Sequence, residues 1–157
     1  MSTHVLIDFL HLAATVVWIG GMVFIPAVFI PAISSLDGPT GGRVFSALGK
    51  RFTIVAWTCT VTLLVTGLLK TPTELLFNLD TRYGTYLTIK HGLFLLMIVV
   101  GLLITLAFVP RMIKLSPKPG ETPSADFIKF QKRIELLSKI NLLLGVLVLL
   151  SLVIMRQ

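Results

Sequence analysis

The stretch HVLIDFLHLAATVVWIGGMVFIPAVFIP, residues 4–31, decides the fold of this chain of 157 residues. The hydrocarbon core of a bilayer is about 30 Å thick, so a helix that spans it needs about 20 predominantly apolar residues. Residues 4–31 exceed that length, and they are too long for the apolar region of a signal peptide. They also lack the basic segment and the small-residue cleavage site of such a peptide. We therefore expect a first transmembrane helix that is retained.

The composition places the whole chain in the membrane. Hydrophobic residues make up 55%, charged residues only 13%, and the mean hydropathy is +0.93, whereas a soluble domain carries about 25% charged residues. Three further segments are long and apolar enough to span a bilayer: about 52–70, 84–109 and 134–155. The sequence thus predicts an all-α, integral membrane four-helix bundle that forms one domain over residues 1–157. Short amphipathic, basic runs at 43–52 and 127–140 are expected at the membrane surface.

The net charge of +7 is distributed unevenly over the connections between the expected helices. Ten of the 14 Lys and Arg residues lie between the first and second helices or between the third and fourth, and three lie on the opposite side. Because cytoplasmic loops carry the Lys and Arg excess, we place these two connections inside and both termini outside in the cell (inner or plasma) membrane. The basic residues would then contact anionic lipid headgroups, so nucleic acid is not needed as a partner.

Ionisable side chains inside a span are costly and usually face the interior of the bundle. Five such residues are candidates for a site: His4, Asp8, His11, Lys90 and His91. The first three follow one another at i, i+4 and i+7, a spacing that puts them on one helix face. This face is the first candidate for a buried cofactor site.

Depth in the membrane relates two of these histidines. His11 lies seven residues after His4 in the first helix, and His91 lies seven residues after Gly84 in the third. Both helices are expected to enter from the outside, so the two imidazoles should lie at matching depth in the outer half of the bilayer. Haem iron is commonly held by axial histidine. The sequence therefore predicts a haem b between His11 and His91.

The polar residues around this site have more than one interpretation. Lys90 and His91 are about 100° apart around the helix, so one is expected to bind iron and the other to act as a propionate partner, proton carrier or supporting group. Asp8 is expected to accept a proton from the ring of either histidine of its own helix, as carboxylates beside metal-bound histidines do, or to pair with Lys90. Three cations at the outer rim would meet haem propionates or extend to the membrane surface: Lys70, Arg82 and Arg156.

The second helix contributes hydroxyl groups and a thiol. Threonine hydroxyls in lipid are expected to hydrogen-bond back to their own helix or across to a neighbour, and this helix holds Thr53, Thr58, Thr60, Thr62 and Thr66. Cys59 is the single cysteine of the chain, so the sequence excludes an intramolecular disulfide and a metal site built from several cysteines.

The first helix also carries a family motif. HLAATVVWIGG, residues 11–21, begins at His11, includes Trp18, and is followed by FIP at residues 24–26. This pattern resembles the first helix of two related groups, the CopD-type copper-resistance membrane domain and the HemJ-type protoporphyrinogen oxidase. The run FSALGKRF is similar to the start of their second helix, and their third helix looks like the segment that holds Tyr83, Gly84, Leu87 and Lys90.

The resemblance implies a four-helix haem b membrane protein, with Trp18 of the motif beside the cofactor. In the HemJ type, a histidine of the first helix and a lysine of the third form the functional pair. They correspond here to His11 and Lys90, which makes Lys90 the catalytic candidate. Two elements of the HemJ type differ: Gly49 stands in place of an acidic residue, and only Asn141 matches the Asn-Glu-x-Pro element of the fourth helix.

Our main hypothesis is a haem b protein that transfers electrons between the quinone pool or a membrane partner and an acceptor at the outer face. Such an oxidoreductase would work in a homo-oligomer or as a subunit of a larger respiratory complex, and His91 favours it because two axial histidines leave no open position on iron. The alternatives are HemJ-like, quinone-linked protoporphyrinogen IX oxidation, CopD-like copper transport or resistance, and a structural membrane subunit. Cu(I) selects thiolate and thioether ligands, but these are scattered at Met22, Cys59, Met97 and Met112.

Overall fold

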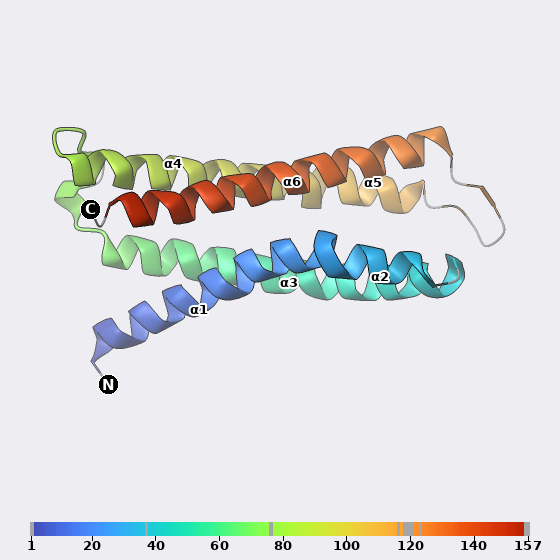
Figure 1. The fold of residues 1–157 in the computed structure, drawn as a ribbon, viewed down its shortest axis with the longest axis horizontal. Helices are drawn as coiled ribbons and strands as arrows, with labels where there is room; N and C mark the ends of the chain where they lie inside the picture. Colours follow the sequence, from blue (N-terminus) through green and yellow to red (C-terminus); the bar gives the residue numbers. More distant parts are fainter. Residues whose placement is uncertain are drawn as a thin grey trace. The chain divides into compact units, whose positions relative to one another are not determined.

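The computed structural model describes residues 2–36, 38–75, 77–115, 117, 121, 122 and 124–155, so Arg156 lies outside the described residues. Over these ranges all regular structure is helical (Figure 1). Four of the described helical stretches are long and apolar enough to cross a membrane: Thr3–Ile33, Ala47–Lys70, Arg82–Lys114 and Ala125–Ile154. The predicted all-α, multi-pass membrane fold is confirmed, whereas the placement of the two termini outside stays a prediction.

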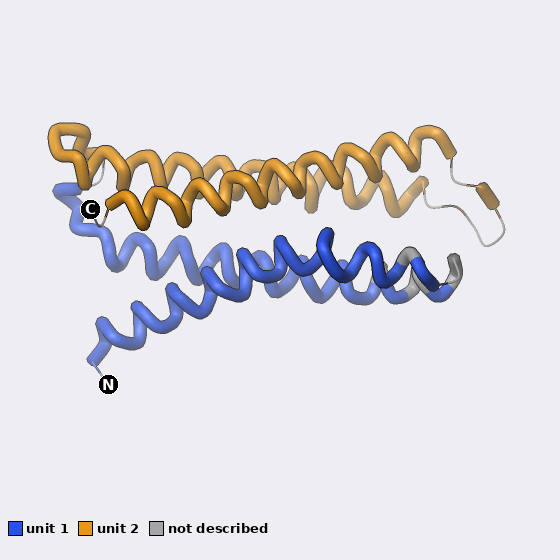
Figure 2. The backbone as a smooth tube through the Cα atoms, in the orientation of Figure 1, with its two compact units in different colours: residues 1–76 blue, residues 77–157 orange. Residues whose placement is uncertain are grey.

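The chain divides into two compact units, Met1–Leu76 and Phe77–Gln157 (Figure 2). Each unit contains a pair of long helices joined by a connection at one end, so the two helices of a pair run in opposite directions (Figure 1). Each unit is described by itself below.

The first unit pairs α1 (Thr3–Phe24) with α3 (Gly38–Lys70). A π-helical segment, η1 (Ile25–Phe29), and the short α2 (Ile30–Ser34) continue α1 without a break. Proline lacks a backbone N–H and its ring clashes with the carbonyl four residues earlier. Pro26 and Pro31 therefore account for the local change from α to π geometry. The pair packs closely at Gly21, where an added Cβ would lie 2.6 Å from Cε2 of Phe52.

The second unit pairs α4 (Arg82–Leu102) with α6 (Ala125–Ile154). The hydroxyl of Thr81 caps the start of α4 by accepting from the N–H of Gly84, and Ser124 caps α6 in the same way. A second π-helical segment, η3 (Leu103–Phe108), connects α4 to α5 (Val109–Lys114). The helix thus passes Pro110 instead of ending with the predicted span at residue 109.

The helices extend beyond the predicted spans for a simple reason. The amphipathic runs at 43–52 and 127–140 are continuous with α3 and α6, so the surface segments and the apolar spans form single helices. Large apolar side chains stay exposed along both units, as Phe9 at 62% and Leu106 at 70% illustrate. Hydrocarbon would cover these side chains, which agrees with a location in the membrane.

Candidate functional site

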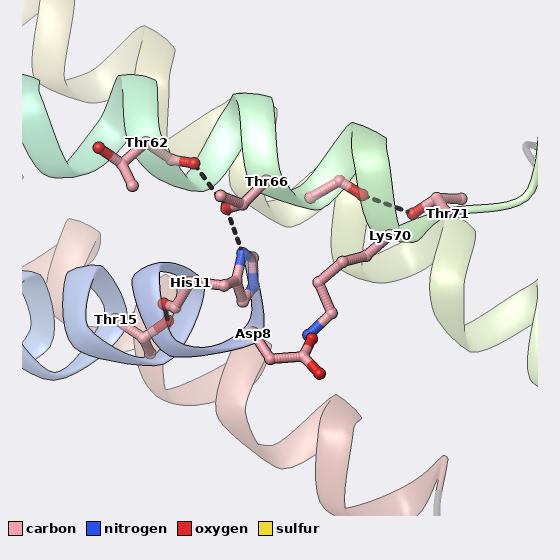
Figure 3. Close-up of polar contacts among 8 residues, drawn as sticks. Asp8, His11, Thr15, Thr62, Thr66, Lys70 and Thr71 are labelled. Carbon is pink, nitrogen blue, oxygen red and sulfur yellow. Dashed lines mark hydrogen bonds and ion pairs between the residues drawn. The ribbon is translucent and has the colours of Figure 1, made fainter. Parts of the chain in front are cut away.

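His11 is joined to the opposite helix of its pair by a short hydrogen bond. Its ring nitrogen Nδ1 lies 2.7 Å from Oγ1 of Thr66 in α3 (Figure 3). Thr66 is only 4% exposed, and the imidazole is half-buried. Gly67 lies beside the same ring, because a Cβ added there would be 3.7 Å from Cε1 of His11. The imidazole therefore lies against α3 at the level of Thr66 and Gly67.

The hydroxyl of Thr66 has a second partner within its own helix. It donates to the backbone carbonyl of Thr62, one turn earlier, with an oxygen–oxygen distance of 2.6 Å. The hydroxyls of Thr60 and Thr62 make the same bond to Ala56 and Thr58. This confirms the predicted bonding of the threonines back to their helix. Thr66 differs because it also reaches the histidine of the neighbouring helix, which places it between His11 and the backbone of α3.

Asp8 forms an ion pair with Lys70, with 2.7 Å between the carboxylate oxygen and Nζ (Figure 3). The side chains are 62% and 41% exposed, respectively. The partner of Asp8 in the structure is therefore Lys70, whereas a histidine of its own helix or Lys90, which lies in the other unit, was expected. Asp8 lies one turn before His11 in α1, and Lys70 lies one turn after Thr66 in α3. The two contacts thus connect the antiparallel helices α1 and α3 at successive turns.

The other candidates of the first unit lie on either side of this pair of contacts. His4 is exposed near the start of α1, about 10 Å along the helix axis from His11 at 1.5 Å per residue. Trp18 lies seven residues after His11, so it shares its helix face, and it is buried with 7% exposure. Its burial makes Trp18 part of the packed interior of the first unit.

The candidates of the second unit all lie on α4. The guanidinium of Arg82 lies 6.0 Å from the ring centroid of Tyr86, in a cation–π contact at the exposed start of the helix. Lys90 and His91 are half-buried neighbours. Nε2 of His91 is buried and has no hydrogen-bond partner in the described part of the chain. His11 and His91 belong to different units, so their pairing around one iron stays a prediction.

The donor set bears on which metal group the chain could hold. Among the described residues, no group of three or more His, Cys, Asp and Glu side chains is placed to hold a metal ion. Cys59 is buried in α3 and belongs to no such group of described residues. A resident copper ion held by several of these side chains therefore does not fit the described residues. An axial ligand to haem iron needs only one imidazole nitrogen, and the buried Nε2 of His91 meets that requirement.

Thr66 is the residue of this site that sequence reasoning missed as a partner of His11. Its hydroxyl was expected to bond back to its own helix or across to a neighbour, but the motif in α1 does not indicate that His11 is that neighbour. The spacing of Thr58, Thr62 and Thr66 at i, i+4 and i+8 was a usable signal, because it aligns three hydroxyl positions on one face of α3. The register of α1 against α3 was the missing information.

Comparison with known proteins gives one family. The model of CopD, copper resistance protein D, matches residues 46–155 of the chain. The match covers most of α3 and the helices α4, α5 and α6 of the second unit, and it leaves α1 with His11 outside. It confirms the CopD-type resemblance and does not bear on the HemJ type. No curated protein and no solved structure matches the chain.

Proposed function

Because this chain belongs to the copper resistance protein D family, we propose that it acts in copper handling as a multi-pass protein of the cell membrane. The family match over residues 46–155 carries the proposal. Copper is here the cargo or the stress to which the protein responds, not a resident ion. The soft donors Cys59 and Met97, of the type that Cu(I) selects, are each buried, one on α3 and the other on α4.

Copper handling is tested in cells of the source organism that lack the chain. We expect their growth at elevated copper, or their cellular copper content, to differ from that of the parent strain, with recovery when the intact chain is supplied. The matched control is growth under zinc or nickel at equally inhibitory concentrations, which should not change. Identical copper tolerance and copper content in the two strains would contradict the proposal.

A second candidate function is the binding of haem b for electron transfer, and one observation favours it. Nε2 of His91 is a buried imidazole nitrogen without a hydrogen-bond partner among the described residues, and such a nitrogen is a suitable axial ligand. His11 would be the other ligand, with Lys90 as the alternative to His91 and Arg82 as a cation for the propionates. Bound haem supplies one-electron transfer between a quinone or partner protein and an acceptor at the outer face.

The two candidates are separated by the absorption spectrum and the metal content of the purified protein. Haem b with two axial imidazoles gives a low-spin spectrum, and we expect both His11→Ala and His91→Ala to lose the haem. Lys90→Ala should retain it if His91 is the ligand. Gly92→Ala is the matched control for α4, because an added Cβ there meets no atom within 4 Å. Full haem retention in both histidine variants, or no haem in the intact protein, would contradict haem ligation.

A further inference from the structure

We propose that Thr66 is a positioning residue that fixes the tautomer of His11, with the proton on Nδ1 and the lone pair on Nε2. The bond between Nδ1 and the Thr66 hydroxyl, 2.7 Å long, crosses from α1 to α3. The Nε2 atom then becomes the ligating nitrogen, and only this last step rests on the function proposed above for His11.

The direction of the cross-helix bond follows from counting protons. A threonine hydroxyl has a single proton to donate. In Thr66 that proton lies on the 2.6 Å bond to the carbonyl of Thr62. The oxygen of Thr66 is therefore the acceptor toward His11, and Nδ1 of the imidazole is the donor. A neutral imidazole with its proton on Nδ1 has its lone pair on Nε2.

The opposite tautomer would lose one hydrogen bond. With the proton on Nε2, Nδ1 becomes an acceptor, and the Thr66 hydroxyl must turn away from Thr62 to donate to it. One bond then replaces the present two. Thr66 is 4% exposed, so water has little access to compensate the loss. The helix pair itself thus selects the protonated Nδ1.

The hydrogen bond from Nδ1 of His11 to Thr66 is similar to the one that metal-bound histidines usually make. A ligating imidazole almost always donates its second ring N–H to an oxygen acceptor, which fixes its orientation and raises its basicity. In most such sites the acceptor is a carboxylate, a carbonyl or water, and here it is a hydroxyl polarised by its own bond to a carbonyl. Asp8 does not take this role because its carboxylate pairs with Lys70.

The first experiment measures the tautomer without any metal or haem. Nitrogen NMR of the full chain with labelled histidine reports which ring nitrogen carries the proton, and His11→Gln identifies the signals of His11. We expect a protonated Nδ1 in the wild type and in Thr66→Ser, and a shift toward protonated Nε2 in Thr66→Val. Gly67→Ala is the matched control, because its methyl group would make an ordinary contact with the ring 3.7 Å away. A protonated Nε2 in the wild type, or an unchanged tautomer in Thr66→Val, would overturn the inference.

The second experiment measures the consequence for binding by titrating haem b into the haem-free protein. Loss of a residue that supports a metal ligand typically costs 10–100-fold in affinity, so we expect about a tenfold weaker binding in Thr66→Val and rescue in Thr66→Ser. Unchanged affinity in Thr66→Val, together with a changed tautomer, would show that Thr66 does not position a ligand. Unchanged affinity in His11→Ala would instead overturn the ligand role of His11 and leave the tautomer assignment in place.

Discussion

The two helix pairs differ in whether a ring nitrogen of their histidine has a hydrogen-bond partner. In the pair α1 and α3, Nδ1 of His11 has a partner at 2.7 Å on the opposite helix. In the pair α4 and α6, Nε2 of His91 is buried without a hydrogen-bond partner among the described residues. A buried polar atom left without a partner bears the full cost of its desolvation. In the first pair, the hydroxyl of Thr66 satisfies the ring nitrogen of His11. In the second pair, a ligand from outside the chain would be needed to satisfy Nε2 of His91.

The largest difference in stability is expected from an added methyl group at one close glycine contact in each unit. In Gly84→Ala the new Cβ would clash with the backbone carbonyl oxygen of Asn78, in the connection that precedes α4. In Gly21→Ala the Cβ would approach the ring of Phe52, a side chain that can move. Overpacking typically costs about 1–3 kcal/mol. We expect Gly84→Ala at the upper end of this range and Gly21→Ala at the lower end, measured as free energies of unfolding in mixed micelles.

Each of these variants has a control on its own helix. A Cβ added at Gly20 or Gly92 meets no atom within 4 Å, so Gly20→Ala and Gly92→Ala should keep or slightly raise the stability. If Gly84→Ala were as stable as Gly92→Ala, the close approach at the start of α4 would not exist in the protein. Equal losses in Gly84→Ala and Gly21→Ala would remove the proposed difference between backbone and side-chain contacts.

The second comparison replaces each histidine by leucine in the protein without ligand. We expect the two substitutions to change the free energy of unfolding in opposite directions. His11→Leu removes the bond to Thr66 and should lower the free energy of unfolding by about 1 kcal/mol, the typical net value of a hydrogen bond. His91→Leu removes a buried nitrogen without a partner and should raise the stability by about the same amount.

Adding haem b should reverse the sign of the stability difference between His91→Leu and the wild type. The wild type gains stability from a ligand that binds only the folded state, and His91→Leu should lose this gain. Thermal unfolding of both variants with and without haem checks the four values. A destabilised, ligand-free His91→Leu would show that Nε2 of His91 has a partner in solution, and the contrast between the two helix pairs would then fail.

The sequence predicts the membrane fold well because long apolar runs have few alternative structures. The ends of the helices were harder to place, since the basic run at 43–52 and the segment beyond Pro110 remain helical without being apolar enough to count as spans. The candidate site was predicted only by helix faces. Periodicity puts Asp8 and His11 on one face of α1, but their partners Thr66 and Lys70 depend on the register between two antiparallel helices. A single sequence does not determine that register.

The smallest expected effect concerns the ion pairs, of which each unit holds one among its described residues. Asp8 and Lys70 connect α1 to α3, whereas Glu135 and Lys139 are neighbours on α6 at i and i+4, and both pairs have N–O distances of 2.7 Å. Charges near lipid are stabilised by pairing, and a pair between helices also fixes their register. We expect Asp8→Asn and Lys70→Gln to lower the stability by less than His11→Leu does. The double variant should recover part of the loss.

The pair on α6 is the matched comparison, because all four side chains are well exposed. Glu135→Gln and Lys139→Gln should change the stability less than the substitutions at Asp8 and Lys70, since Glu135 and Lys139 are already kept adjacent by their own helix. Double-mutant cycles in nanodiscs, at low and high salt, measure both coupling energies. The coupling of Asp8 with Lys70 should decrease at high salt if the pair lies at the water interface. Additive single effects at Asp8 and Lys70 would mean that the pair does not form in the bilayer. The polar connection between α1 and α3 would then depend on His11 and Thr66 without the ion pair.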